Sequence, residues 1–173
     1  MHYSRRTANL LGAAALGVTD LALARVTSAA AVSASGAAAL VVLASATTLG
    51  VTELGCRVGL SQSAAARMAG SLERDGLVQR TAGAGRLVHV SLTEQGIRAA
   101  HELLAAREAP LADVLTALDE HEQRTLAELL EKLLPKLYGK IGNADLVCRL
   151  CDRPACTERA VCPVGQAERD RAG

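Results

Sequence analysis

The chain has 173 residues and a formal net charge of +1, and half of its residues are hydrophobic. This length fits one domain, or one domain followed by a tail, and the apolar content is enough for a real core. Because the chain has no Trp or Phe and only two Tyr, that core must consist of Leu, Val and Ala, with little surface on which a flat aromatic ligand could stack. The small net charge excludes a generally basic nucleic-acid binder.

The N-terminal third contains two segments that imitate targeting signals. Residues 4–11, SRRTANLL, resemble a twin-arginine export signal, but charged residues interrupt the apolar run behind them. Residues 29–52 are uncharged and long enough to cross a bilayer, yet they are rich in Ala, Ser, Thr and Gly, which are weak membrane formers. We therefore expect two soluble helices, one from Thr7 to about Ser28 and a buried one from Ser33 to about Ala44. A turn should follow at residues 47–50.

Residues 51–76 have the pattern of two helices joined by a tight turn. Thr52 can cap a short first helix, and Gly59 fits just past its end, where only glycine adopts a left-handed conformation cheaply. Ser61 can cap a second helix that runs from Gln62 to about Asp75, and Gly76 ends it. Apolar residues recur at helical spacing along this second helix and should face the core: Ala65, Met68, Ala69 and Leu72.

Two short strands follow the helix pair. Residues 77–81 and 87–92 alternate apolar and polar side chains, as half-buried strands do. The glycine-rich residues 82–86 between them form a flexible hairpin tip that carries Arg86. Thr93 can cap the next helix. The order helix, turn, helix, strand, loop, strand predicts a winged helix-turn-helix, a DNA-binding fold.

The start of the second helix carries the candidate DNA-binding residues: Ser61, Gln62, Ser63 and Arg67. A helix in the major groove uses its N-terminal side chains, and Gln, Arg and Ser can bond adenine, guanine and several base edges respectively. Arg86 on the hairpin could reach the adjacent minor groove, whose negative potential attracts a guanidinium. Residues 51–98 hold six Arg against four acidic residues, so the affinity should be modest and salt-sensitive. The alternative is an ordinary pair of solvated helices.

The stretch GLSQSAAARMAGSLERDGLVQR, followed by GRLVHVSLTEQG, resembles the MarR-type transcription regulators. The resemblance covers the chain from about Thr7 to Tyr138. It implies a homodimer, most often of a repressor, with a recognition helix at residues 61–75 and a wing arginine at Arg86. The family's wing commonly carries Asp-x-Arg, whereas this chain has Ala84-Gly85-Arg86, so the aspartate that positions the wing is missing.

The segment after Thr93 predicts a dimer arm. A helix should continue to about Arg107, and Pro110 should break or kink it. Asp119 and Glu122 form a capping-box pattern at the start of a further helix, and Pro135 should kink or end that helix. A broad apolar stripe on this helix should bury against a partner subunit rather than against the subunit's own core: Leu126, Leu129, Leu130, Leu133, Leu134 and Leu137.

Four of the five cysteines cluster near the C-terminus, beyond a linker at residues 138–142. Cys148, Cys151, Cys156 and Cys162 follow the spacing C-x2-C-x4-C-x5-C. Clustered cysteines in an intracellular protein indicate metal rather than disulfides. Four thiolates can enclose zinc, which is slightly favoured, or hold an iron–sulfur cluster; a thiol redox switch without metal is the third alternative. The isolated Cys56 should be a small buried apolar residue.

These features predict a mainly α fold with a small β-hairpin wing, a winged helix-turn-helix with N- and C-terminal dimerisation helices. Residues 1–140 should form the MarR-like domain and residues 143–173 a cysteine-rich, metal-binding tail. Within the domain, the DNA-binding lobe should occupy about residues 33–98, and the dimer arms about residues 7–28 and 93–138.

The predicted function is that of a dimeric, sequence-specific DNA-binding transcription regulator in the cytoplasm, and not an enzyme. Its partners should be a second copy and a pseudo-palindromic operator in double-stranded DNA, with no membrane partner. The tail would couple metal or redox state to DNA affinity by changing the spacing of the two recognition helices. One alternative is a regulator that responds to a small-molecule effector and has a purely structural zinc tail. The other is an exported or membrane-associated protein.

Overall fold

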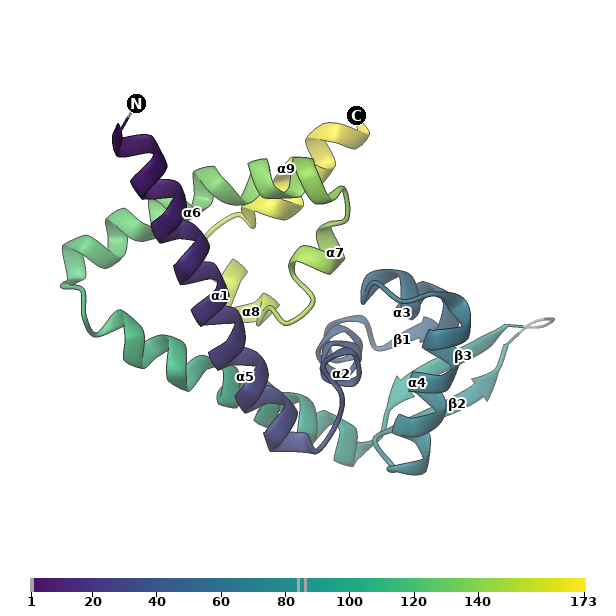
Figure 1. Ribbon diagram of the computed structural model, residues 1–173. Coiled ribbons are helices and arrows are strands. Elements are labelled where there is room, and N and C mark those ends of the chain that lie inside the picture. The colour runs from purple at the N-terminus through teal and green to yellow at the C-terminus, as the bar shows by residue number, and fades with distance from the viewer. Residues whose placement is uncertain (1, 84, 86) are drawn as a thin grey trace.

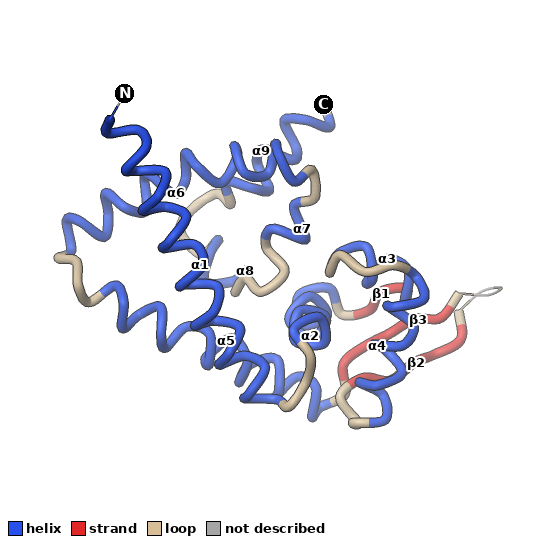
Figure 2. The backbone as a smooth tube through the Cα atoms, viewed as in Figure 1, coloured by secondary structure: helices blue, strands red, loops and turns tan. Residues whose placement is uncertain are grey.

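The computed structural model describes residues 2–83, 85 and 87–173. It is mainly helical with a small antiparallel sheet, which confirms the expected fold class (Figure 2). The strands are β1 (Thr48–Gly50), β2 (Val78–Ala82) and β3 (Val88–Leu92). The helices are α1 (His2–Ala30), α2 (Ala34–Ala46), α3 (Val51–Arg57), α4 (Gln62–Arg74), α5 (Glu94–Leu115), α6 (Glu120–Ile141), α7 (Ala144–Val147), α8 (Arg153–Thr157) and α9 (Pro163–Ala172).

The elements form two groups with the tail between them. Figure 1 shows α2, α3, α4 and the sheet together in one lobe, from which the β2–β3 hairpin projects away from the rest of the molecule. The long helices α1, α5 and α6 form the other group, where α1 packs along α5. The tail helices α7 and α9 pack on α6, and α7 lies on the side of α6 that faces α3 (Figure 1). The tail is therefore placed to contact both groups.

The sheet in the described part of the chain has three strands in the order β1-β3-β2, all antiparallel. In the register, β3 residue Val90 lies opposite Leu49 of β1 and Arg80 of β2. The turn expected at residues 47–50 is instead a strand, β1, entered through Thr47 with a φ of 59°. Three residues are too few to show the alternation that identifies a strand, so the sequence carried no signal for β1.

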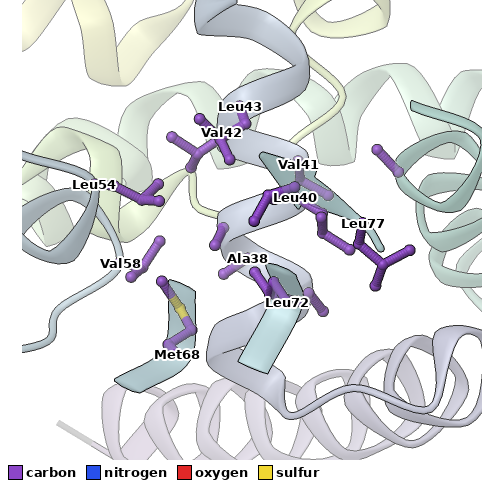
Figure 3. Close-up of a cluster of buried hydrophobic side chains, with 14 of the residues drawn as sticks. Ala38, Leu40, Val41, Val42, Leu43, Leu54, Val58, Met68, Leu72 and Leu77 are labelled. Carbon is purple, nitrogen blue, oxygen red and sulfur yellow. The ribbon is translucent and has the colours of Figure 1, made fainter. Parts of the chain in front are cut away.

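The hydrophobic core of the lobe surrounds α2 (Figure 3). Ser33 caps α2 as expected, since its Oγ accepts a hydrogen bond from the Gly36 amide at 3.1 Å. The run from Gly36 to Leu43 is buried without interruption, and Leu40 is fully inaccessible. A helix covered on all sides needs no polar face. This explains why residues 29–52 are uncharged. These residues do not form one continuous helix, because they include the end of α1, all of α2 and β1, and the start of α3.

Within the described residues, the segment Ser4–Ser28 of α1 is long and apolar enough to cross a membrane, and 11% of its most apolar window is buried. The same helix packs against α5 in the fold. Several large apolar side chains of this helix are 40% to 70% exposed: Leu10, Leu11, Leu16, Val18 and Leu21. In this single chain, α1 therefore presents an apolar surface that nothing covers.

Neither internal proline ends its helix, so the expected break at Pro110 and the expected end at Pro135 are wrong, whereas the alternative of a kink at each stays a prediction. The helix containing Pro110 continues to Leu115, and the helix containing Pro135 continues to Ile141. A proline removes one intrahelical hydrogen bond, but α6 is fixed at both of its ends. The predicted capping box is present, with both Asp119–Glu122 hydrogen bonds at 2.9 Å, and a left-handed Gly142 closes the helix. The expected linker at residues 138–142 is accordingly the last turn of α6.

Candidate DNA-reading surface and cysteine cluster

The two helices of the helix-turn-helix pack closely through a glycine. A β-carbon at Gly55 of α3 would lie 2.6 Å from Cβ of Ala65 in α4, a separation that larger residues could not accept without moving the helices apart. The turn is closed by a hydrogen bond of 2.8 Å from the Leu60 amide to the Gly55 carbonyl. Gly59 has a φ of 75°, as expected for a left-handed residue past the end of α3. Helices α3 and α4 are therefore in direct contact at Gly55 and Ala65.

Of the expected N-caps, those at Ser61 and Thr93 are present and the one at Thr52 is not. The first helix begins one residue before Thr52, and its N-cap is Gly50, which makes no side-chain hydrogen bond. Ser61 caps α4 as predicted, since its Oγ accepts a hydrogen bond from the Ala64 amide at 3.4 Å. Thr93 caps α5 in the same way at 3.0 Å and also donates to the Gly76 carbonyl at 2.6 Å. These bonds fix where α4 begins and where the sheet leads into α5.

The candidate DNA-binding side chains of α4 share one exposed face. Ser61, Gln62, Ser63 and Arg67 are all exposed, and the described residues offer Arg67 no salt bridge. The apolar positions expected to face the core are buried at 9% exposure or less: Ala65, Met68, Ala69 and Leu72. The polar start of α4 is therefore held outward by a firmly packed opposite face.

The hairpin beside α4 is braced at its base. Arg80 of β2 donates from Nε to Glu73 of α4 at 2.7 Å. This hydrogen bond lowers the pKa of the Glu73 carboxyl and raises that of Arg80. The predicted wing residue Arg86 lies outside the described residues, so its position stays a prediction. The sequence analysis missed the Glu73–Arg80 pair, because a contact between a helix and a later strand has no signature in residue spacing.

The four tail cysteines converge on one cavity. Cys148, Cys151, Cys156 and Cys162 all line a cavity of about 290 Å³, together with Arg153 and other residues of α8 and α9. The thiols lie close enough to shift one another's pKa values, Cys148 with Cys151, Cys151 with Cys156, and Cys162 acting on Cys156. Among the described residues, no group of three or more His, Cys, Asp or Glu is arranged as a metal site. The sulfurs are brought together but are not set as a complete ligand shell.

The thiols in this chain differ in acidity because their surroundings differ. The hydrogen bond from Cys151 lowers the pKa of Cys148. The reciprocal bond, together with burial, raises the pKa of Cys151 far above its usual range. Burial raises the pKa of Cys156 to about 11. Without a cation, the cluster thus holds its protons unevenly, and Cys148 is the first candidate for a thiolate.

The tail has a small core of its own, which the sequence analysis did not find. Tyr138 of α6, Ala144 of α7 and Val164 of α9 are buried together. Cys162 caps α9, since its Sγ accepts a hydrogen bond from the Gly165 amide at 3.3 Å. Tyr138 is one of only two tyrosines in the chain, and that rarity was the available clue. The remaining cysteine, Cys56, is exposed. The expectation of a buried Cys56 is wrong, because α3 is covered by the lobe on its other face.

The comparisons with known proteins point to one family. A sequence model described as the MarR family matches residues 17–84, which extend from α1 into the hairpin. The transcriptional repressor MprA of Escherichia coli (strain K12) is 33% identical over 88 residues, which is 50% of this chain and 50% of MprA. The alignment thus spans half the length of this curated relative, and the family model ends before the cysteine tail.

Solved structures extend the likeness of the fold. The YusO protein from Bacillus subtilis is 28% identical, with a TM-score of 0.67 over 76% of this chain and 94% of that one. A MarR family protein from Bacillus stearothermophilus has a TM-score of 0.69 at 24% identity, over 79% of this chain and 96% of that one. Proteins of this family are transcription regulators and not enzymes, as the sequence analysis expected. The match to residues 17–84 and the shared winged helix-turn-helix fold show that this chain is similar to the MarR family.

Proposed function

We propose that this chain is a DNA-binding transcription regulator that uses the start of α4 as its recognition helix. The observation that carries the proposal is the division of α4 into a buried apolar face and an exposed face with Gln62, Ser63 and Arg67 near its N-terminus. Such side chains can bond base edges and phosphates when the helix enters the major groove. A regulator of this kind acts in the cytoplasm, and this is the compartment we propose.

The same proposal includes a homodimer formed through the long helices. Helix α6 carries five apolar side chains that are each 40% to 51% exposed in the single chain: Leu129, Leu130, Leu133, Leu137 and Ile141. Together with the uncovered leucines of α1, they form an apolar surface of the kind that a partner subunit buries. A two-fold axis through these arms would set two recognition helices on successive turns of DNA, so the operator should be pseudo-palindromic.

Binding of a selected duplex tests the proposal. Duplexes enriched from a random pool by the full-length protein should contain two inverted half-sites about one helical turn apart. Arg67→Ala should weaken binding of the selected duplex by about 5- to 150-fold, the equivalent of 1–3 kcal/mol. Arg124→Ala is the matched control, because Arg124 is an exposed arginine of α6 that pairs with Glu120. Equal binding by both variants across a salt titration would contradict the assignment of α4.

The tail supports a second activity, the binding of a thiophilic metal. Four thiols line one cavity, and four thiolates can surround a tetrahedral zinc ion, in which the sulfurs are about 3.8 Å apart. Zinc and an iron–sulfur cluster share this ligand chemistry. Elemental analysis and a visible spectrum of anaerobically purified protein distinguish them. Protein that contains neither metal, and whose thiols do not take up added zinc, would contradict the proposal and leave the redox switch.

The alternative regulator would sense a small molecule and use the tail only as structure. A cavity of about 430 Å³ lies between α1, α5, α6 and the tail. Its lining includes apolar side chains and two arginines, Arg107 and Arg149, which suits an apolar anion. The four cysteines line this cavity too, so a small molecule bound there would lie beside the thiols.

A further inference from the structure

The first turn of the tail rests directly on the turn of the helix-turn-helix. Asn143 donates from Nδ2 to the carbonyl of Cys56, the next-to-last residue of α3, at 3.2 Å. A β-carbon at Gly59 would lie 3.0 Å from Cδ1 of Leu146, so Leu146 lies over the glycine that ends α3. Further along, Leu150 packs against the core of the lobe. We call residues 143–150 the latch.

One carboxylate joins the latch to both the lobe and the cysteine loop. Asp145 lies 3.6 Å from Nε of Arg57 in α3, and 2.6 Å from Nη2 of Arg153 in α8. Arg153 stands between Cys151 and Cys156 in the chain and lines the same cavity as the thiols. A half-buried carboxylate between two guanidiniums is held more firmly than an exposed pair. A shift of the cysteine loop is therefore passed to α3 through Asp145.

The C-terminal end of the latch contains Cys148 and leads directly into Cys151. Cys148 is the C-cap of α7, with its amide donating to the Ala144 carbonyl at 3.0 Å, and the Cys151 amide donates to the Cys148 carbonyl at 2.9 Å. Two of the four sulfurs thus belong to the backbone turn that carries the latch. An ion that draws the four sulfurs together must fix the position of the end of α7. It thereby also fixes the contact between α7 and α3.

We propose that metal occupancy of the four cysteines sets the position of the recognition helix through the latch. This inference rests on the proposed DNA-binding function. Helices α3 and α4 cannot slide on each other, because Gly55 and Ala65 are in close contact. If α7 shifts the position of α3, the position of α4 therefore changes with it. The protein would have two states. In the metal-bound state the latch is held against the lobe, and in the metal-free state the latch can leave the lobe. The two states bind the operator with different affinities.

The test compares zinc-loaded and zinc-free full-length protein on the selected duplex. In the unaltered chain, the two dissociation constants should differ by about fivefold or more, the lower end of ordinary allosteric coupling. The double variant D145N/L146A loses the ion pairs and the contact over Gly59 but keeps all four cysteines. Its two constants should be equal, while it still binds one zinc per chain with the stoichiometry of the unaltered protein.

Asp170→Asn is the matched control, since Asp170 is an exposed acid of α9 that bonds only within its helix to Gln166; it should keep the full difference. The inference is overturned if the double variant retains zinc and the full difference, or if the unaltered chain binds zinc with no difference. Failure of every form to bind any duplex overturns the DNA assignment instead, and failure to take up zinc overturns the metal site. Because coupling is reciprocal, the duplex must also change zinc affinity by the same factor.

Discussion

The DNA-binding lobe and the cysteine tail are built in different ways. The lobe has a continuous core around α2, in which Leu40, Leu43 and Leu54 are nearly or fully inaccessible. The tail contributes two buried residues, Ala144 and Val164, which pack with Tyr138 of α6. Burial of apolar surface thus fixes the lobe, whereas helix caps, ion pairs and a small core hold the tail. A region with so small a core has a low free energy of local unfolding.

This contrast bears on which region can respond to a signal. The lobe must present α4 in one fixed orientation, and dense packing provides that rigidity. The tail must exist in more than one state if it is to report the presence of an ion, and a small core allows that. The contact between them is narrow, through the latch. The following variants measure whether the two regions differ in stability as this contrast requires.

The largest effect should come from the lobe core. Leu40→Ala should reduce the free energy of unfolding by about 2–5 kcal/mol, because it removes buried methyl groups and leaves a cavity. Denaturant titration followed by circular dichroism would measure it. Val164→Ala should barely move this main transition, since Val164 belongs to the separate small core. It should instead accelerate hydrogen exchange of the α9 amides. Equal shifts of the main transition would show that lobe and tail unfold as one unit.

The next effect tests the rigid pairing of α3 with α4. Gly55→Ala adds a β-carbon 2.6 Å from Cβ of Ala65, and such overpacking should cost about 1–3 kcal/mol. Duplex binding should weaken as well, because α4 must move away from α3. Gly70→Ala is the control on α4, where an added β-carbon meets nothing within 4 Å. It should leave stability equal or raise it by about 0.5–1 kcal/mol, as alanine favours the helix. A destabilised Gly70→Ala protein with a stable Gly55→Ala protein would refute the packing argument.

Much of the lobe could be predicted from sequence because its signals are local. The caps at Ser33, Ser61 and Thr93 and the left-handed Gly59 follow from residue type and immediate neighbours, and all four are present. The buried face of α4 followed from periodicity. What failed depended on the wider context: β1 was too short to show a pattern, and neither internal proline ended its helix because packing and caps hold both sides.

The tail was harder to predict for a physical reason. Cysteine spacing indicated that the four thiols meet, and they line one cavity. Nothing local indicated that Asn143 bonds the Cys56 carbonyl, 87 residues earlier in the chain, or that Asp145 bridges Arg57 and Arg153. Contacts between exposed polar groups far apart in sequence leave no periodic trace. The contact surface between tail and lobe, on which the proposed coupling depends, could be found only in the fold.

The smallest change in the free energy of unfolding should come from removing one helix cap in each region. Thr93→Ala removes the cap of α5 and the bond to the Gly76 carbonyl, and should lower the main unfolding free energy by about 1 kcal/mol. Asp152→Ala removes the cap of α8, a bond of 3.1 Å to the Ala155 amide, and should leave the main transition unchanged. Because α8 carries Cys156, its loss should instead raise the rate at which a thiol reagent modifies that cysteine, and added zinc should suppress the increase. If Asp152→Ala lowers the main transition as much as Thr93→Ala does, the tail is part of the lobe's cooperative unit. The latch could then not change its conformation independently of the lobe.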